Sequence, residues 1–579
     1  MPARRKSKFY RLVSRLEKAL LRCGKGADML VGTVLSKWCE LSFPGLPKPR
    51  LPTHKALLEE PAVAELVKWM QDEDFLHATY WLSSVYALLS GETYRKKLAM
   101  FFTPPSLTKR LLDDLDAAGV DFGKRTFCDP ACGGAAFLAP VAQRMRVALL
   151  AKGATAHQVL DHVTNHVYGT DMDRTLCELS RHFLMMVLRD EILATGKVPE
   201  LRVARCDSLQ GLEALYGTMD VLTCNPPYRK MAADEVTTYR AQFPEVIESQ
   251  PNLYSLFIAL CVKLMKPGGV CALVTPTSFL SGQYFSQLRT FLMHETEVLS
   301  IGMVSDRTGV FMDVEQETAL TLLQRAAHDV PSCTSAKVSV VSRDGDYVSV
   351  GNCALPNSGA AWPIPRTETD LALLARATKL PYRLVDYGYV ARTGSFVWNR
   401  DKRPTYISAA MATRNTDGSA VPLLWSSDIK LDGSLSFDGE RKANKEPCFV
   451  ALGSKFHPSV IRQPSLVLQR VTSNDQPRRL VAAAVPQHML EKHGGFVGEN
   501  HTVILVRQAD QALLTPTQMA QLLRTPVVDR YFRCISGTTS VSLFELNQLV
   551  LPDPRRVATL LTHGLPMERA VELAYHTET

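Results

Sequence analysis

The sequence predicts an α/β fold with an open, mainly parallel sheet covered by helices on both faces. From Phe101 to about Arg325, short apolar runs alternate with amphipathic helical segments, which is the pattern of such a sheet. Before this block, apolar residues recur at helical spacing, and after it short β-like runs are mixed with many arginines. We therefore expect a helical N-terminal extension at 1–95, the sheet domain at 96–330, a linker or peripheral strands at 331–379, and an α+β domain at 380–579.

The elements of the sheet domain can be assigned in order. Apolar runs predict strands at 125–129, 166–171, 201–207, 220–225, 270–276, 298–304 and 317–325. The clearest helices between them cover 173–190 and 253–269, and the second ends in a Pro-Gly-Gly stop that leads into the next strand. In the N-terminal extension, 27–38 and 61–70 have helical periodicity.

Composition excludes several classes of protein. The chain of 579 residues is 46% hydrophobic and 21% charged, and its net charge of +8 is compatible with a polyanionic partner without identifying one. Its 13 cysteines form no CxxC pair, which argues against a disulfide framework and a zinc ribbon, so we predict a cytoplasmic protein without a metal. No apolar segment is long enough to predict export or a membrane span.

Ligands of an open parallel sheet bind beyond the carboxyl ends of its strands, so the residues at these ends are candidates for a site. Asp129 follows the first strand and precedes the small residues Ala131 and Gly133, which permit a tight turn close to a ligand. A tight turn without a ligand explains this segment alone equally well. Asp171, followed by Met172, ends the second strand and is placed to bind ribose hydroxyls, although a helix cap is an alternative.

Two further strand ends complete the pattern. Asp207 follows the third strand and could accept a hydrogen bond from an adenine amine or cap a turn. The fourth strand ends in Asn225, Pro226, Pro227 and Tyr228. Asn225 and the carbonyl of Pro226 offer two acceptors for an amine on a stiff backbone, and Tyr228 offers a flat face for a base. Two acceptors favour a pyramidal amine with its lone pair available for attack, so no separate strong base is needed.

Together these residues resemble the S-adenosylmethionine-dependent amino-methyltransferases that act on adenine in DNA in bacterial restriction and modification systems. The resemblance covers about residues 95 to 325 and implies a Rossmann-like class I methyltransferase domain. The segment "FFTPPSLTKRLLD" looks like the family's first motif and implies that Thr103 and Pro104 contact the methionine part of the cofactor. The turn "DPACGGAAFL" looks like the cofactor turn, but Ala135 stands where the family most often has a third glycine.

The resemblance also assigns roles to the other strand ends and to a later motif. It implies Asp129 near the methionyl amine, Asp171 at the ribose and Asp207 at the adenine amine of S-adenosylmethionine. "TGVFMDVEQETALTLLQR" is similar to the motif whose aromatic residue packs on the extruded base, which implies Phe311 opposite Tyr228. A core phenylalanine is an alternative explanation of Phe311.

The motif order matches the subgroup with a C-terminal target-recognition domain, and "RTPVVDRYFRCISGTTSVSLFELNQLVLPDP" is similar to the close of such domains. Recognition of double-stranded DNA is therefore expected at 380–579, although exposed arginines are most often only solvated. Our candidates for DNA contact are Arg400, Lys402, Arg470, Arg478, Arg479, Asn500 and His501.

The expected activity is methylation of adenine N6 within a specific DNA sequence, in the cytoplasm and nucleoid of a bacterium. Alternatives are an N-methyltransferase acting on RNA bases or on protein glutamine, and a modification or specificity subunit of a larger complex. The first 95 residues show no Glu-x-Lys carboxylate cluster, so we predict no DNA cleavage by this chain. A cognate restriction endonuclease on a separate chain and a solitary enzyme are both compatible with the sequence.

Overall fold

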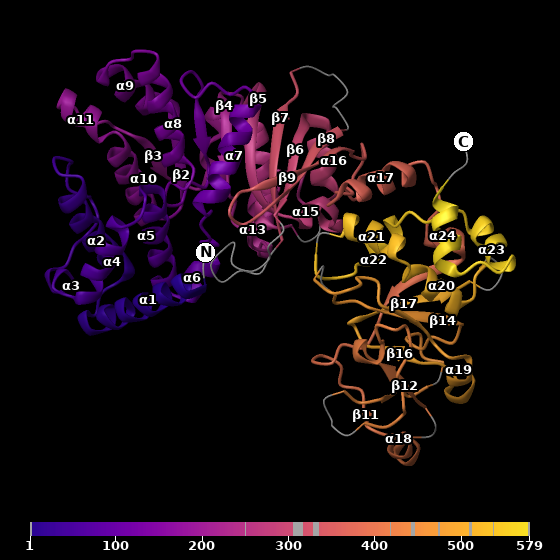
Figure 1. Ribbon diagram of the computed structural model, residues 1–579. Helices are drawn as coiled ribbons and strands as arrows, with labels where there is room; N and C mark the ends of the chain where they lie inside the picture. The colour runs from indigo at the N-terminus through magenta and orange to yellow at the C-terminus, as the bar shows by residue number, and fades with distance from the viewer. Residues whose placement is uncertain are drawn as a thin grey trace. The chain divides into compact units, whose positions relative to one another are not determined.

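The computed structural model describes residues 3–248, 251–304, 317–327, 335–416, 419–441, 446–454, 456–472, 475–508, 512–536 and 538–576. Contacts divide the chain into two compact units, and each is described here by itself. Unit 1 contains Met1–Phe279, Tyr284–Asn352 and Asn357–Gly359, and unit 2 contains Leu280–Gln283, Cys353–Pro356 and Ala360–Thr579. The labels of helices and strands are those of Figure 1.

The N-terminal part of unit 1 is helical. Its helices are α1 (Ala3–Cys23), α2 (Ala27–Ser42), α3 (Lys55–Leu58), α4 (Pro61–Gln71), α5 (Phe75–Leu89) and α6 (Glu92–Leu98). They begin at ordinary start signals: Pro61 occupies the first turn of α4, and Asp74 caps α5 by accepting a hydrogen bond from the backbone N–H of His77. Phe9 of α1 lies 4.5 Å from Trp81 of α5 between ring centroids, so aromatic packing joins the first helix to the rest.

A nine-stranded sheet forms the centre of unit 1, with the order β3-β2-β1-β4-β5-β7-β6-β8-β9. Its strands are β1 (Phe127–Asp129), β2 (Val167–Asp171), β3 (Arg202–Arg205), β4 (Met219–Cys224), β5 (Met265–Pro276), β6 (Thr296–Val304), β7 (Thr318–Arg325), β8 (Ser335–Val341) and β9 (Tyr347–Ala354). Strands β1 to β5 pair in parallel, whereas β7 is antiparallel to both β5 and β6. All seven predicted strands are present, and the chain order reverses between β1 and β4, where open sheets bind ligands.

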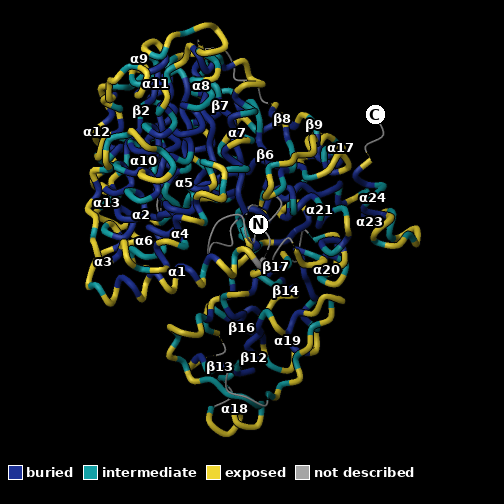
Figure 2. The backbone as a smooth tube through the Cα atoms, turned by 60° about the vertical axis from the view of Figure 1, so that its left-hand side comes forward, coloured by how far each residue is buried: buried dark blue, intermediate teal, exposed yellow. Residues whose placement is uncertain are grey.

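Both faces of the sheet are covered. Along β5, Val270, Ala272 and Val274 belong to the same hydrophobic core as the helices α1 to α10, while the alternate residues Cys271 and Leu273 are 0% and 1% exposed on the opposite face. The strands are accordingly dark blue in much of Figure 2. The covering helices are α7 (Pro105–Ala117), α8 (Leu138–Ala151), α9 (Ala156–His166), α10 (Arg174–Val187), α11 (Arg189–Thr195), α12 (Ser208–Gly211), α13 (Ala233–Tyr239), α14 (Leu253–Leu264), α15 (Ser278–Ser281) and α16 (Ser286–Glu295).

Unit 2 is an α+β structure with two four-stranded sheets, ordered β10-β17-β14-β15 and β11-β13-β12-β16. The strands are β10 (Tyr389–Thr393), β11 (Thr405–Tyr406), β12 (Ala420–Leu424), β13 (Phe449–Ala451), β14 (Ser465–Gln469), β15 (Ala482–Ala484), β16 (Val497–Gly498) and β17 (Thr502–Arg507). The helices are α17 (Glu368–Ala377), α18 (Ala409–Asn415), α19 (Gln487–His493), α20 (Pro516–Leu523), α21 (Pro526–Ile535), α22 (Leu543–Gln548), α23 (Pro554–Thr562) and α24 (Met567–Tyr575). Within the described ranges of both units, no helix has the length and apolarity to cross a membrane.

Candidate functional site

The turn after β1 is shaped by buried polar and small residues. Asp129 is 1% exposed, and its Oδ1 accepts a hydrogen bond of 3.0 Å from the backbone N–H of Ala131. Burial raises the pKa of Asp129 well above its usual range, because a carboxylate is poorly solvated there. The turn therefore presents a buried acidic group whose charged form is disfavoured.

Close packing explains the glycines of this turn. A Cβ on Gly134 would lie 2.0 Å from Oγ of Ser83 in α5, so only glycine fits against that helix. Gly133 has φ +50°, and Ala135 has φ +58°, so both adopt the left-handed conformation. Ala135 thus adopts the left-handed conformation that favours glycine. The turn therefore forms although alanine replaces the glycine of the family pattern.

Asp171 holds the second strand end against the first. Its Oδ2 accepts from the backbone N–H of Gly133 at 3.0 Å, and its Oδ1 accepts from the N–H of Asp173 at 2.8 Å. Burial raises the pKa of Asp171 to about 6 despite these bonds. The helix cap belongs to Asp173, which accepts from the N–H of Leu176 at 2.9 Å.

Asp207 is placed at the third strand end and has two partners. It caps α12 by accepting from the N–H of Leu209 at 3.1 Å, and its Oδ2 accepts from the hydroxyl of Tyr239 at 2.7 Å. The cap and the predicted binding role are therefore compatible, because a carboxylate has lone pairs for further donors. Tyr239 lies at the end of α13, so this bond joins the third strand end to the segment that follows the fourth.

The amide of Asn225 is fixed on both sides. Its Nδ2 donates to the main-chain carbonyl of Phe101 at 3.0 Å, and its Oδ1 accepts from the hydroxyl of Tyr228 at 2.5 Å. The same hydroxyl lies 2.7 Å from the carbonyl oxygen of Val274, so its single proton is shared between the two acceptors. These contacts set which end of the amide is the acceptor, and they hold Oδ1 on the side of Tyr228.

Tyr228 has an edge-to-face neighbour. Its ring centroid lies 6.1 Å from that of Tyr254 with an interplanar angle of 81°, and Tyr254 stacks on Phe285 at 5.0 Å. Burial raises the pKa of the Tyr228 hydroxyl, which therefore acts as a donor. Phe311, the predicted partner of Tyr228, lies outside the described residues.

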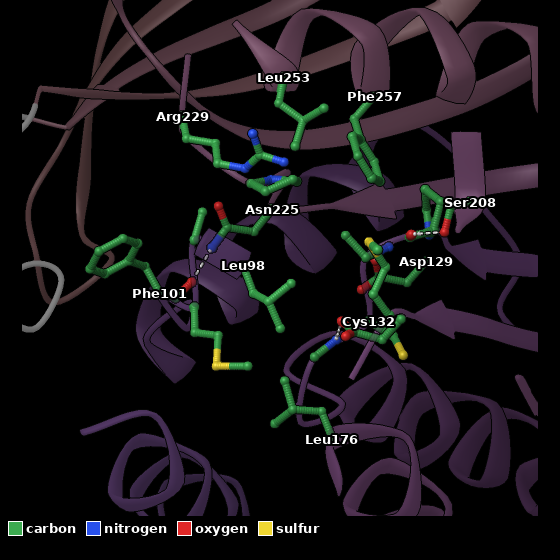
Figure 3. Close-up of a pocket in the computed structure, with 18 of the residues that line it drawn as sticks. Leu98, Phe101, Asp129, Cys132, Leu176, Ser208, Asn225, Arg229, Leu253 and Phe257 are labelled. Carbon is green, nitrogen blue, oxygen red and sulfur yellow. Dashed lines mark hydrogen bonds between the residues drawn. The ribbon is translucent and has the colours of Figure 1, made fainter. Parts of the chain in front are cut away.

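The four strand ends line one open cavity of about 130 Å³ in unit 1. Figure 3 shows Asp129 and Cys132 on one side and Asn225, Arg229 and Phe101 on another. The predicted residues that line it are Thr103, Asp129, Ala131, Gly133, Asp171, Met172, Asp207, Asn225 and Pro227. Pro104, Pro226 and Tyr228 do not line it; Pro104 is instead the cap of α7.

Thr103 lines this cavity and carries a buried polar atom. The residue is 2% exposed, and its Oγ1 has no hydrogen-bond partner among the described residues. A buried hydroxyl without a partner loses solvation without compensation, so a bound polar group would satisfy it. This atom is the clearest indication that the cavity suits a ligand with a polar group.

Sequence reasoning missed part of the lining. The segment 97–102 contributes one wall, and Arg229, Glu235 and Tyr239 contribute another. Arg229 forms an ion pair with Glu235, which lies in the first turn of α13. The sequence indicated the wall at 97–102 only through the neighbouring Thr103. No sequence motif indicated the wall formed by Arg229, Glu235 and Tyr239.

The chain between Arg229 and Leu253 forms a loop whose two ends lie side by side at the cavity. The backbone N–H of Leu253 donates to the carbonyl of Arg229 at 2.9 Å, and that of Met231 donates to Pro251 at 3.2 Å. Lys230 and Asn252 form an antiparallel bridge between these bonds. We call residues 231–251 the clipped segment, because its two ends are joined at its base.

In unit 2, three of the predicted DNA contacts lie together. The backbone N–H of Arg470 donates to the carbonyl of His501 at 2.8 Å, and its Nη1 donates to the carbonyl of Asn500 at 2.9 Å. His501 is exposed and contacts the buried carboxylate of Glu499 through Nδ1 at 3.0 Å. The cluster sits where β14 ends and β17 begins.

The other candidates are divided between surface and core. Arg400 and Lys402 are exposed. They follow Phe396, whose carbonyl accepts a hydrogen bond from the backbone N–H of Asn500. Arg478 is half-buried. The interpretation of Arg479 as a DNA contact is wrong, because it is 0% exposed and its Nη2 donates to Ser536 and to the carbonyl of Thr538 at 2.8 Å.

Comparison with known proteins agrees with this geometry. Residues 165–311 match the family model of the Eco57I restriction-modification methylase. The chain is 24% identical over 339 residues to the Type II methyltransferase M.BsuBI of Bacillus subtilis, and 27% identical over 344 residues to M.PstI of Providencia stuartii. Each alignment covers 57% of this chain, and the chain spans only 64% of the length of either relative.

Solved structures extend the similarity beyond the sheet. The Type IIL restriction-modification enzyme MmeI in complex with DNA has a TM-score of 0.58 at 12% identity, over 98% of this chain and 91% of that one. A DrdV–DNA complex has a TM-score of 0.51 at 12% identity, over 90% and 61%. The resemblance predicted from the motifs is thereby confirmed: the sheet domain has the class I methyltransferase fold, and residues 165–311 carry the sequence pattern of the Eco57I restriction-modification methylases.

Proposed function

We propose that this chain is a site-specific DNA methyltransferase that transfers a methyl group from S-adenosylmethionine to N6 of adenine. One observation carries the proposal: Asp129, Asp171, Asp207 and Asn225, from four successive strand ends, line the same cavity. The first three offer acidic acceptors, and the fourth offers a fixed amide oxygen. The acidic residues therefore mark the part of the cavity proposed for the cofactor, and Asn225 marks the part proposed for the target amine.

The residues of the cavity fit S-adenosylmethionine. Thr103 offers a hydroxyl that lacks a partner among the described residues, suited to the methionine end of the cofactor. Asp171 would accept from the ribose hydroxyls and Asp207 from the adenine amine. When bound, the cofactor supplies an electrophilic methyl group on a sulfonium.

Asn225 would then organise the target amine. Oδ1 has a second lone pair beside the one used by Tyr228, and the bond from Nδ2 to Phe101 prevents the amide from turning over. An N6 amine that donates to Oδ1 of Asn225 keeps its lone pair for attack. A bond forms between N6 and the methyl carbon, the bond between that carbon and sulfur breaks, and one N6 proton passes to water. Alignment supplies most of the rate.

Double-stranded DNA is the proposed substrate, with the adenine rotated out of the helix to reach Asn225. Support comes from the similarity of the whole chain to restriction-modification enzymes solved with DNA, and from the cluster in unit 2 of exposed His501 with half-buried Arg470 and Asn500. We assign sequence recognition to unit 2. RNA-base and glutamine methylation remain the alternatives, and a separate endonuclease partner is compatible with the proposal.

Single-molecule sequencing of plasmid DNA from cells expressing the chain tests this proposal. We expect N6-methyladenine in one sequence context, absent from cells that express Asn225→Ala. The purified Asn225→Ala protein should still bind S-adenosylmethionine in calorimetry, which shows that it is folded. Methyl transfer to RNA or to protein with unmodified DNA would replace the proposal by one of its alternatives.

A further inference from the structure

We propose that the exposed face of α1 binds the phosphate backbone of the DNA substrate, an inference that rests on the proposed function. The whole net charge of the chain is carried by its first 25 residues, most of which form this helix. Nine of the 66 basic residues and one of the 58 acidic residues lie within residues 1–25, which gives that segment a net charge of +8. The remaining residues contain 57 of each sign and are neutral as a whole.

Helical spacing gathers this charge into one stripe. The basic stripe consists of Lys8, Arg11, Arg15, Lys18 and Arg22, whose successive spacings of three and four residues place them on one side of a helix. From the first to the last, a helix rises about 21 Å at ~1.5 Å per residue. All five residues are exposed, and α1 shows its alternation of exposed and buried positions in Figure 2.

Most of the stripe is available to a partner. Lys8, Arg11 and Lys18 form no ion pair with any residue that the structure describes. Arg15 pairs with Glu65 and Arg22 with Glu60, but the two arginine side chains are 50% and 61% exposed. Surface pairs of this kind are weak, so phosphate can replace the carboxylates.

The opposite face of α1 excludes insertion into a membrane as the reason for its charge. Phe9, Leu12, Leu16 and Ala19 are at most 1% exposed and lie in the core of unit 1. A helix that binds a bilayer needs its apolar face for the lipid, and this face is already used. A polyanion in water is the partner that fits the remaining basic face.

The stripe belongs to the same compact unit as the cavity. Helix α1 contacts α5, and α5 contacts α6, whose Lys97 and Leu98 line the cavity. DNA with a base in the cavity therefore has a basic surface on the same compact unit. Unit 2 would recognise sequence, whereas α1 would bind any sequence.

Salt-dependent DNA binding tests the inference. A fluorescein-labelled duplex of random sequence is titrated with the full chain at several salt concentrations, and anisotropy gives the affinity. In the triple variant Lys8→Gln, Arg11→Gln, Lys18→Gln, the slope of log affinity against log salt should fall by about two to three, at ~0.9 for each phosphate that is no longer neutralised. The charge-preserving variant Lys8→Arg, Arg11→Lys, Lys18→Arg should keep the wild-type slope.

A matched removal of charge elsewhere separates direct binding from net charge. Lys124, Lys337 and Lys379 are exposed lysines outside α1, and their combined change to Gln should leave the slope nearly unchanged. An unaltered slope in the α1 triple variant would overturn the inference. So would binding of the wild type, but not of the triple variant, to phosphatidylglycerol vesicles without any change in DNA affinity.

These outcomes are distinct from failure of the proposed function. If DNA binding depends on α1 but no adenine is methylated, the methyltransferase assignment fails and the basic stripe stands. If adenine is methylated and the triple variant binds DNA as the wild type does, the inference about the basic stripe is rejected and the methyltransferase proposal is kept. Cofactor calorimetry on each variant confirms that the sheet domain is intact.

Discussion

Asn225 and Phe101 are joined by a hydrogen bond of 3.0 Å from the side-chain Nδ2 to the main-chain carbonyl, although they are 124 residues apart in sequence. Asn225→Asp would replace that donor by an oxygen facing an oxygen. We expect methyl transfer to fall at least ~100-fold, the scale of losing a positioned polar group in a transition state. Transfer of a tritium-labelled methyl group from S-adenosylmethionine to DNA measures the rate of methylation.

Binding of S-adenosylmethionine should change little in Asn225→Asp, because the acidic residues at the other strand ends are untouched. Calorimetry provides this control. A fully active Asn225→Asp would show that the amide orientation set by Phe101 has no part in the reaction.

Asp171 predicts opposite pH dependences for folding and for binding. Burial raises its pKa to about 6, above ~3.9 for an exposed aspartate. The charged form is disfavoured in the folded chain, so its contribution lowers the free energy of unfolding as pH rises from about 4 to 6. Cofactor hydroxyls need the ionised carboxylate, so affinity should fall below pH 6, by at most about tenfold per pH unit.

Calorimetry between pH 5 and 8 on the wild type and on Asp171→Asn tests the second statement. Asp129 is also buried and has a raised pKa, so the variant shows what pH dependence remains without Asp171. Identical profiles for the two proteins would remove Asp171 from cofactor binding.

Tyr239 and Asp207 give a prediction with a definite sign. The Tyr239 hydroxyl donates to Oδ2 of Asp207 at 2.7 Å, the oxygen that is not used by Leu209. Tyr239→Phe should tighten cofactor binding by about fivefold, because the carboxylate then has one fewer donor to share. Asp207→Ala should weaken it by at least as much. Weaker binding by Tyr239→Phe would instead mean that the hydroxyl positions Asp207.

The contact of Gly134 with α5 predicts a rescue. A Cβ at Gly134 would lie 2.0 Å from Oγ of Ser83, so Gly134→Ala should lower the free energy of unfolding by about 1 to 3 kcal/mol. The double variant Ser83→Gly, Gly134→Ala should recover part of this loss. Gly211→Ala is the control, because its Cβ would meet Cys206 at an ordinary 3.6 Å. Denaturant unfolding gives the three values, and additive losses would contradict the contact.

Arg470 and Arg479 should separate DNA binding from stability. Arg479 is fully buried and hydrogen-bonded within unit 2, so Arg479→Ala should cost about 3 kcal/mol of stability. Arg470→Ala should lower DNA affinity with little change in melting temperature, since its side chain donates to the carbonyl of Asn500, whereas its bond to His501 comes from the backbone and is kept in alanine. Thermal melting and anisotropy together make the comparison. Equal melting temperatures for the two variants would refute it.

The sheet was predictable because its signal is local. The parallel strands β1 to β4 have Asp129, Asp171, Asp207 and Asn225 at or just after their ends, and parallel strands bring those ends to one edge. Asp129, Asp171, Asp207 and Asn225 therefore met in one cavity as expected. The end of α14 was less predictable, since β5 begins at Met265, before the Pro-Gly-Gly stop.

Other features depend on contacts between distant residues and leave no local pattern. Nothing around Phe101 signals that its carbonyl fixes Asn225, and nothing in α13 signals that Tyr239 reaches Asp207. Arg479 illustrates the reverse error: it stands in a polar run beside Arg478, yet it is buried against α21. Sequence shows the charge of an arginine, whereas burial is decided by the partners that surround it.

The clipped segment, residues 231–251, has a consequence for how such enzymes diversify. Because its ends are joined by the Lys230–Asn252 bridge, changes in its length need not move Asn225 or the start of α14. The fold thus offers a site for insertions directly beside Asn225 and its cavity. Grafting a longer loop at 240–245 should preserve cofactor affinity while altering DNA methylation, and loss of cofactor binding in such grafts would show that the two ends are not independent of what lies between them.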